Sequence, residues 1–424
     1  MSLKELRAQI AKLDTEIDLQ RELLRKLERD RSLAQRHINN LLDPVALLPL
    51  EISSEIFLQT LAPFPEPGAL RAPMLLLGIC NAWTDIALAT PTLWDAIHIV
   101  FPCARDLKKI LPIWFERAQH RPLSVSLRGT FTHNVVDIIW AHGQRLKHLE
   151  IFDPQAQYAE GEETELWEGT GPGPLLSLET LIMRATHFDC GLISPRHTFD
   201  LLRLAPNLTE CLFHNSDIVP DVVTTEILVL PKLRRLMFGE GGTRPIGSQD
   251  LLSHLSLPAL ETLGSDGSSD NLFSFLSRSL PPLVELVLGN GWEFDPSAQY
   301  LGTLPHLRRL EVWYPRCHSV EQFFVALAES PFLLPRLDTL VMHVHSNRDQ
   351  AHDLSDSFWE ELNRALVARR TQLQLFHLTV PAGNGVPEWK TPAPDIIAAF
   401  TELAADGVEI RLSANGGTWN HTFN

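Results

Sequence analysis

His343, His345, His352 and Asp353 are residue types that bind metal ions, and they stand close together in the sequence. His343 and His345 are two positions apart, so in a strand they would lie on one face. No cysteine accompanies them, and their spacing matches no familiar zinc site. The sequence therefore favours solvated or structural histidines here and predicts no bound metal.

Other catalytic patterns are equally weak. Prolines interleave Gly169, Gly171 and Gly173, and no lysine follows them as a phosphate-binding loop requires. The sequence holds no G-x-S-x-G nucleophile motif and no cysteine–histidine pair at a readable spacing. We expect no catalytic residue, no cofactor and no enzyme activity.

The composition limits the kinds of partner. The 424-residue chain carries a formal net charge of -16, which argues against a nucleic acid or an anionic membrane as partner. Its five cysteines are scattered and odd in number, which favours reduced thiols inside a cell. Charges begin at Lys4, unlike a signal peptide, and no apolar run reaches the ~18 residues of a membrane helix. The expected location is cytoplasmic or nuclear.

We therefore look for function in binding surfaces. Residues 47–99 contain the most specific pattern of the chain. Pro49 suits the first turn of a helix. Apolar residues follow at helical spacing: Ile52, Ile56, Phe57 and Leu61. A proline-rich gap ends that helix, a second apolar run covers 74–88, and Thr90 and Pro91 suit the start of a third helix. The segment predicts about three short helices.

The letters of this segment resemble the F-box, in the form found in F-box-like proteins of mushroom-forming fungi. The matching residues are Leu48, Pro49, Glu51, Ile52, Glu55, Ile56 and Phe57, then Cys80, Trp83, Ile86, Ala87, Thr90, Pro91, Leu93 and Trp94. The resemblance implies docking to the Skp adaptor of a Skp–cullin–F-box ubiquitin ligase. It implies these adaptor contacts: Leu48, Pro49, Ile52, Ile56 and Phe57. Some of these side chains also serve the core of the domain, and Trp83 is expected there.

Residues 1–42 predict one continuous helix, because no glycine or proline occurs before Pro44. Its apolar residues recur at alternating spacings of three and four, which is typical of a coiled coil. The seam holds Leu3, Leu6, Ile10, Leu13, Ile17, Leu24, Leu27, Ala34, Ile38 and Leu41, interrupted by Gln20 and Arg31. The two interpretations are a homodimer through residues 3–41 and a helix that packs on its own chain or another partner.

Beyond residue 140, the phrase L-x-x-L-x-L recurs. Its copies begin at Leu146, Leu178, Leu208, Leu233, Leu260, Leu283, Leu307, Leu337 and Leu375, and Val408–Leu412 is a possible last one. Proline often stands two residues before the copy, and helix-like stretches lie between copies: 197–204, 249–255, 270–280, 320–329 and 355–370. The pattern resembles leucine-rich repeats, which implies parallel strands lining a concave face and helices outside.

The expected fold is therefore α/β. It comprises a coiled-coil-like helix at 1–42, a small all-α F-box-like domain at 43–100, a linking segment at 101–140 and an irregular leucine-rich-repeat solenoid, or horseshoe, at 141–424. Residues between the ladder leucines are the place to seek target contacts. The candidates in or just past such strands are Trp313, Tyr314, Arg316, His343 and His345.

Two functional hypotheses follow. The first is a non-catalytic substrate receptor of a Skp–cullin–F-box ubiquitin ligase, whose repeats bind an unidentified target protein. The second is an interaction scaffold assembled by the N-terminal coiled coil, with no ubiquitin link, in which the F-box-like helices only cap the solenoid. Binding to the adaptor discriminates the two hypotheses.

Overall fold

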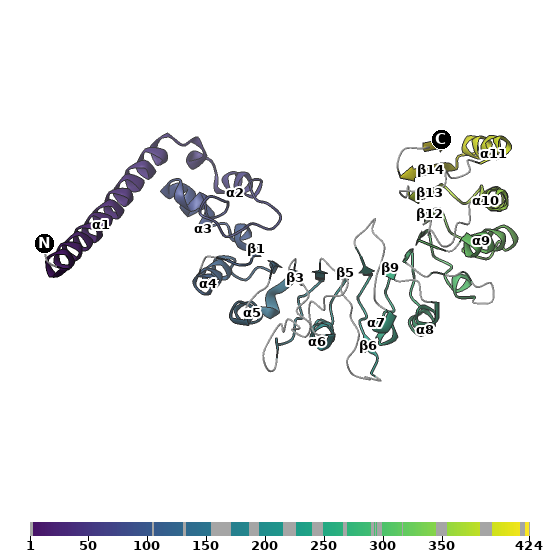
Figure 1. The fold of residues 1–424 in the computed structure, drawn as a ribbon, viewed down its shortest axis with the longest axis horizontal. Helices are drawn as coiled ribbons and strands as arrows, with labels where there is room; N and C mark the ends of the chain where they lie inside the picture. Colours follow the sequence, from purple (N-terminus) through teal and green to yellow (C-terminus); the bar gives the residue numbers. More distant parts are fainter. Residues whose placement is uncertain are drawn as a thin grey trace. The chain divides into compact units, whose positions relative to one another are not determined.

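The computed structural model describes residues 3–103, 106–129, 133–153, 171–185, 195–214, 226–239, 249–265, 269–289, 292, 294, 299–315, 317–344, 354–381, 392–415 and 420–423. The chain divides into two compact units, Met1–Ser126 and Leu127–Asn424. Figure 1 shows that helices dominate the first unit, whereas the second has a sheet with helices along one face. Within the described ranges, no helix has the length and apolar character needed to cross a membrane.

The first unit begins with a single long helix. Helix α1 covers Leu3–Leu42, as the heptad pattern predicts. All its described side chains are exposed, including the apolar ones of the seam. It contacts α3 of the same unit.

Short helices follow α1. They are η1 (Pro44–Leu47), α2 (Leu50–Leu58), η2 (Leu76–Gly78), α3 (Asn81–Leu88) and η3 (Pro91–Trp94). The second predicted helix is broken at Cys80, whose backbone is extended and whose Sγ accepts from Trp83 N at 3.4 Å. Thr90 precedes η3 as expected, but its hydroxyl donates to Ile86 O at 2.7 Å instead of capping the new turn.

A strand corrects the expectation of an all-α segment at 43–100. Residues Ala96–Val100 form β1, which lies beside β2 (Leu123–Arg128), with α4 (Leu107–Arg117) between them in sequence. Pro112 does not interrupt α4. The core holds Trp94 against Trp114, with ring centroids 5.0 Å apart, and Trp94 Nε1 donates to Ala87 O at 2.9 Å. The ordinary β preference of the run AIHIV explains the strand.

The second unit is built on a large, mostly parallel sheet. Its strands, in spatial order, are β3 (Leu146–Asp153), β4 (Thr180–Ala185), β5 (Glu210–His214), β7 (Arg235–Phe238), β9 (Thr262–Ser265), β10 (Glu285–Leu288), β11 (Arg309–Trp313), β12 (Thr339–His343), β13 (Leu375–Pro381), β14 (Glu409–Asn415) and β15 (Asn420–Phe423). Their order follows the sequence, and only β15 is antiparallel to its neighbour. Strands β6 (Leu228–Val229) and β8 (Leu255–Ser256) form a separate parallel pair.

The recurring leucine phrase explains this sheet. Each described copy ends in a strand, and its ladder residues are buried, as in Leu181, Leu286 and Leu310. A backbone contact repeats at the same step of each copy: Arg234 N and Arg235 N both donate to Thr209 O, as Arg308 N and Arg309 N do to Val284 O. Identical local geometry holds the parallel register from strand to strand.

Helices connect successive strands. The second unit contains α5 (His133–Trp140), η4 (Gly143–Arg145), α6 (Pro195–Leu204), α7 (Gln249–Ser253), α8 (Ser269–Ser279), η5 (Gln299–Thr303), α9 (Cys317–Glu329), α10 (Asp356–Arg369) and α11 (Pro394–Ala405). The stretches expected to be helical are helical, except that α7 ends early and Leu255 enters β8. Helix α11 and strand β15 were not expected from the leucine phrase.

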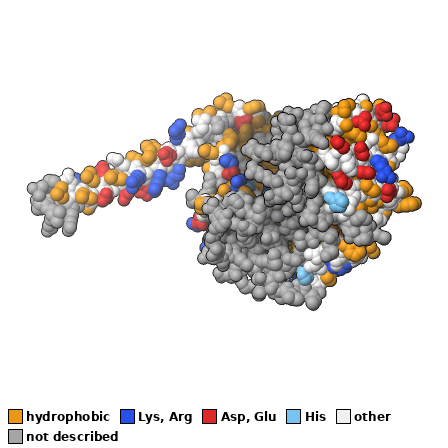
Figure 2. All heavy atoms as spheres, turned by 45° about the vertical axis from the view of Figure 1, so that its right-hand side comes forward, with side chains coloured by type: hydrophobic (Ala, Val, Ile, Leu, Met, Phe, Trp, Pro, Cys, Tyr) orange, Lys and Arg blue, Asp and Glu red, His pale blue; other side chains and the backbone are white. Residues whose placement is uncertain are grey.

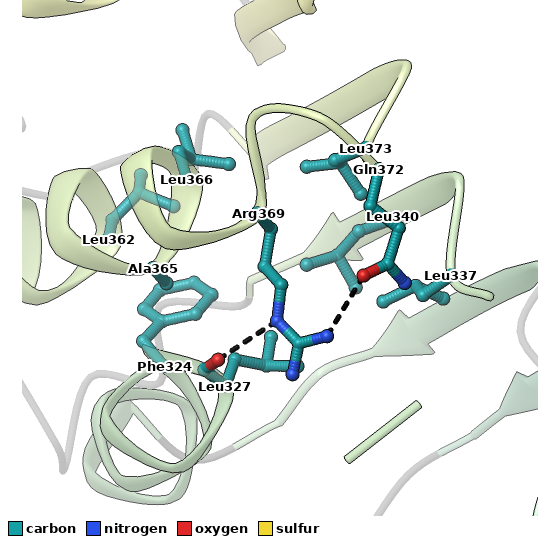
Figure 3. A pocket seen from close by; sticks show the side chains of 10 residues that line it. All are labelled: Phe324, Leu327, Leu337, Leu340, Leu362, Ala365, Leu366, Arg369, Gln372 and Leu373. Carbon is teal, nitrogen blue, oxygen red and sulfur yellow. Dashed lines mark hydrogen bonds between the residues drawn. The ribbon is translucent and has the colours of Figure 1, made fainter. Parts of the chain in front are cut away.

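Arg369 ties two neighbouring helices together. It stands at the end of α10 and is buried, and it donates to four carbonyl oxygens in and just after the last turn of α9: Leu327, Ser330, Pro331 and Leu333. Its remaining donor goes to Gln372 Oε1 at 3.0 Å (Figure 3). All five N–H groups of the guanidinium are therefore used. The adjoining cavity measures only about 10 Å³, too small for a ligand, so this region is closed core.

Arg278 repeats the arrangement. It stands in the last turn of α8 and donates to the carbonyl oxygens of Leu252 and Leu255, at the end of α7, at 2.7 to 3.0 Å. A cation near carbonyl groups at a helix C-terminus is favourable because it meets the negative end of the helix dipole. We call Arg278 and Arg369 the helix-end arginines.

Candidate functional site

In the first unit, α2 presents apolar side chains to solvent. Leu48, Ile52 and Ile56 are 41%, 51% and 39% exposed. Ile52 and Ile56 are four residues apart and lie along one face of α2, and Leu48 stands in extended backbone just before the helix. Pro49, at the N-cap position of α2, is also exposed. We call these four residues the α2 surface. Exposed apolar residues grouped in this way mark a binding surface more often than scattered ones do.

The adjacent side of α2 anchors it to the unit. Phe57 is fully buried and its ring lies 4.8 Å from that of Trp83. The buried Ser53 hydroxyl donates to the carbonyl oxygens of Val45 and Pro49. Of the five predicted adaptor contacts, Phe57 therefore stabilises the core, whereas the other four are accessible.

In the second unit, one face of the sheet carries the residues that lie between the ladder leucines. Strand alternation and register align them in a row across neighbouring strands. The row runs Glu150, Ile182, Leu212, Met237, Gly264, Val287, Glu311, Val341, His377 and Arg411. We call this the open face, since the ladder leucines point the other way into the core.

The middle of the open face is apolar. Leu212, Met237 and Val287 form a buried cluster against which Ile182 and Trp313 pack. Gly264 makes this possible, because a Cβ there would lie 2.6 Å from Met237 Cε. The methionine side chain thus crosses β9 in the space that the glycine leaves.

A polar group centred on Glu311 borders this apolar cluster. Trp313 Nε1 donates to Glu311 Oε1 at 2.8 Å, and His343 Nε2 lies 3.3 Å from the same oxygen. Arg309 binds the other carboxylate oxygen at 2.6 Å and also reaches Glu285 at 3.1 Å. The rings of Trp313 and His343 are stacked, with centroids 3.7 Å apart. We call Arg309, Glu311, Trp313 and His343 the Glu311 cluster.

Charge and burial oppose each other at Glu311. Burial by itself would raise the pKa of its carboxyl group, but hydrogen bonds from His343 and Arg309 and the charge of Arg309 outweigh this effect. They lower the pKa of Glu311 to about 2. The carboxylate therefore stays ionised and holds the two rings in fixed positions.

His377 extends the polar group toward the end of the sheet. Its Nε2 lies 3.3 Å from Ser413 Oγ and 3.2 Å from Thr379 Oγ1. Burial lowers the pKa of His377, and electrostatic interactions with His343 and Arg411 lower it further. The imidazole is thus held in its neutral form, where one ring nitrogen remains an acceptor.

The structure brings three of the five predicted target contacts together. Trp313 stacks on His343, and Tyr314 follows with its ring 5.9 Å from that of Trp313. Tyr314 has a positive φ of 55° and its N–H donates to His343 O at 2.7 Å, which fixes the end of β11. Arg316 and His345 lie outside the described residues.

Sequence reasoning missed Glu311, Arg309 and His377. The signal for them was strand alternation: Glu311 lies between Leu310 and Val312, and His377 between Phe376 and Leu378. A charged residue between two ladder residues has to face the open side of the sheet. That position puts the Glu311 side chain on the same face as Trp313, where the structure buries it.

Two other features bear on the chemistry. A hollow of about 600 Å³ in the first unit is lined by Arg71, Glu66, His98 and Cys103, among others. Its polar side chains are paired: Arg71 binds Glu66 at 2.6 Å, and His98 Nδ1 lies 2.9 Å from Ser126 Oγ. In the part of the chain that the structure describes, no three histidine, cysteine or acidic side chains are grouped for a metal ion; His345, His352 and Asp353 fall outside it.

No protein-family model matches this chain, and no curated protein matches it.

Proposed function

We propose that this protein is a non-catalytic substrate-recognition subunit of a Skp–cullin–F-box ubiquitin ligase. The first unit docks to the Skp adaptor through the α2 surface. The second unit, as a leucine-rich-repeat solenoid, binds a target protein. Ubiquitin transfer takes place on other subunits, and this chain contributes proximity. Such a ligase works in the cytoplasm or nucleus.

The observation that carries the proposal is the division of α2 into two sides. Ser53 and Phe57 fix the helix on its own unit, while Leu48, Ile52 and Ile56 remain accessible at positions that match the F-box letters. A helix that is anchored on one side and apolar on the other suits a groove in a partner protein. Apolar side chains at the centre of such an interface carry much of its binding energy.

The Glu311 cluster supports the second half of the proposal. Trp313 and His343 form a partly exposed aromatic pair whose orientation is set by one carboxylate. Rigid aromatic groups lose little conformational entropy when a partner binds. We assign the target contact to Trp313, Tyr314 and His343, beside the apolar centre of the open face.

The first test is co-purification with a Skp-family adaptor. The intact chain is expected to bind, and Ile52→Ala/Ile56→Ala is expected to weaken binding by at least about tenfold, because two interface side chains are truncated. The matched control is Leu70→Ala/Val100→Ala, which truncates two exposed apolar residues of the same unit away from α2. Circular dichroism shows whether each variant is folded. A folded intact chain that does not bind any Skp-family adaptor overturns the proposal.

The target side is tested by protein turnover in cells. Proteins that accumulate when Ile52→Ala/Ile56→Ala replaces the intact chain are expected to accumulate also with Trp313→Ala/His343→Ala. Two sets without overlap contradict the assignment of the target contact.

The alternative is an interaction scaffold without a ubiquitin link. The exposed seam of α1 favours it, because that helix could assemble chains with no adaptor present. Loss of adaptor binding in a folded chain that still self-associates would leave this alternative as the better one.

A further inference from the structure

Helix α1 exposes an apolar stripe along most of its length. The described members are Leu6, Ile10, Leu13, Ile17, Leu24, Leu27, Ile38 and Leu41, each between 41% and 85% exposed. A 40-residue helix is about 60 Å long. Figure 2 shows hydrophobic side chains along this helix, interspersed with charged ones. Helix α1 contacts α3, but these side chains stay exposed in the described part of the chain. Their apolar area is therefore available to a binding partner.

The residue types in the stripe match those that favour a two-stranded coiled coil. Numbered as a heptad with Leu6 at position d, the a positions include Ile10, Ile17 and Ile38, and the d positions include Leu13 and Leu27. β-Branched residues at a with leucine at d favour two parallel strands over three or four. The core pattern thus points to a pair of helices.

The flanking charges fit a parallel pair of identical helices. In that arrangement each g residue faces the e residue five positions later in the other helix. Glu16 then meets Arg21 of the second copy, and symmetry provides this ion pair twice. The other g–e combinations that follow, such as Leu23 with Glu28 and Asp30 with Gln35, bring no like charges together.

The same charges oppose an antiparallel pair. In an antiparallel pair, each a residue of one helix packs against a d residue of the other. Position e then faces e, and position g faces g. Asp14 would then meet Glu28, Glu16 would meet Asp30, and Arg21 would meet its own copy. Each combination is repulsive, and like charges at such positions are destabilising.

Polar residues in the stripe fix the register. Gln20 at d and Arg31 at a would face their own copies in a parallel pair. Two glutamine side chains can bond each other and favour this register, whereas the two like-charged arginines oppose it and reduce the stability of the pair. A register shifted by one heptad would place both pairs against apolar residues instead.

We propose that α1 forms a parallel two-stranded coiled coil with α1 of a second copy of this chain. This inference does not depend on the adaptor or on ubiquitin. A parallel pair puts both first units at the same end of the coil, and if the second units bind a target as proposed above, the dimer carries two such binding sites. The gain in avidity is set by the reach between them.

The mass of the full-length protein in solution tests the assembly. Light scattering after size exclusion is expected to give twice the chain mass of 47.7 kDa at micromolar concentration. Leu13→Asp/Leu27→Asp is expected to give the mass of a single chain. The matched control is Leu19→Asp/Leu33→Asp, which makes the same change at exposed leucines on position c, away from the seam, and should remain dimeric. A monomer, a trimer, or a dimer that survives the seam substitutions overturns the proposal.

Charge exchange tests the orientation. In a parallel pair, Glu16→Arg places arginine against Arg21, so the dissociation constant should rise roughly three- to tenfold. Glu16→Arg/Arg21→Glu restores the pair with reversed signs and should recover most of the affinity. In an antiparallel pair, Glu16→Arg would instead face Asp30 and tighten association. A tighter dimer, measured by sedimentation equilibrium, therefore refutes the parallel arrangement.

Discussion

The rings of Trp313 and His343 are stacked 3.7 Å apart at an interplanar angle of 17°, and one oxygen of Glu311 contacts a nitrogen of each. The two residues come from neighbouring strands, since Trp313 pairs in register with His343. A cross-strand aromatic pair of this kind is thus fixed in two ways, by ring contact and by a shared acceptor. Its orientation is set before any partner arrives.

Replacement of Glu311 should loosen this pair. Glu311→Gln retains the size of the side chain but removes the charge that Arg309 and His343 contact, and we expect a loss of about 2 kcal/mol in the free energy of unfolding. Glu285→Gln is the control, because Glu285 also binds Arg309 but is more exposed, and it should cost under about 1 kcal/mol. Denaturant unfolding measures both. Equal effects for the two variants would contradict a special role for Glu311.

The same carboxylate should make stability depend on acid pH. The pKa of Glu311 is about 2 in the folded protein, below its ordinary value of 4.5, so its contribution is present above pH 4.5 and is lost as pH falls through 2. The difference in unfolding free energy between the parent and Glu311→Gln should therefore shrink steadily below about pH 4.5. A difference that is constant down to about pH 2 would refute this.

His377 should act in a higher pH range. Burial, with His343 and Arg411, lowers its pKa below the ordinary value of 6.5, so the unfolded chain takes up the proton more readily than the folded one. Stability from this group is therefore lost as pH falls below 6.5. His377→Gln should reduce the change in unfolding free energy between about pH 7.5 and 5.5. An NMR titration that gives His377 a pKa above 6.5 would exclude this account.

Arg369 should be among the most costly positions to change. Arg369→Met leaves the carbonyl oxygens at the end of α9 without their buried donor, and we expect a loss of about 3 to 5 kcal/mol. Arg369→Lys cannot replace five donors with three and should recover little of it. The control is the next residue: Arg370→Met removes an exposed arginine and should cost under about 1 kcal/mol. Thermal or denaturant unfolding measures both variants. Equal losses for Arg369→Met and Arg370→Met would contradict a stabilising role for the hydrogen bonds of Arg369.

Gly264 should reject a methyl group. Gly264→Ala forces Met237 to move from a contact of 2.6 Å, with an expected cost of about 1 to 2 kcal/mol. Gly302→Ala is the control, because a Cβ there meets nothing within 4 Å. The variant Met237→Ala/Gly264→Ala should cost less than the sum of the two single changes, since the clash is then absent. Additive costs would mean that the two residues do not share the space.

The sequence predicted the periodic parts of the fold. Buried leucines such as Leu181, Leu286 and Leu340 are fixed by pattern, and the long apolar period at 1–42 required a helix. Local chemistry was harder to read. The strand Ala96–Val100 lay inside a segment expected to be helical, because a five-residue apolar run does not distinguish helix from strand.

The Glu311 cluster shows why a site is harder to predict than a fold. Trp313, Tyr314 and His343 were identifiable as strand-end residues, but Glu311, the acceptor that Trp313 and His343 share, was not. Its contact with His343 depends on the register between β11 and β12, which cannot be inferred from either strand's sequence alone. Arg369 was missed for the same reason, since its partners lie about 40 residues earlier in the chain.

The helix-end arginines impose an order in which the helices of the second unit become stable during synthesis. Arg278 serves the end of α7 and Arg369 the end of α9, so each arginine leaves the ribosome after the helix that it completes. Until then the carbonyl groups at those helix ends remain hydrated. The helix most recently added to a growing chain is therefore the least stable one. A nascent chain in which α9 has emerged but Arg369 is still inside the ribosome should thus leave α9 open to protease, while one arrested well beyond Arg369 should protect α9.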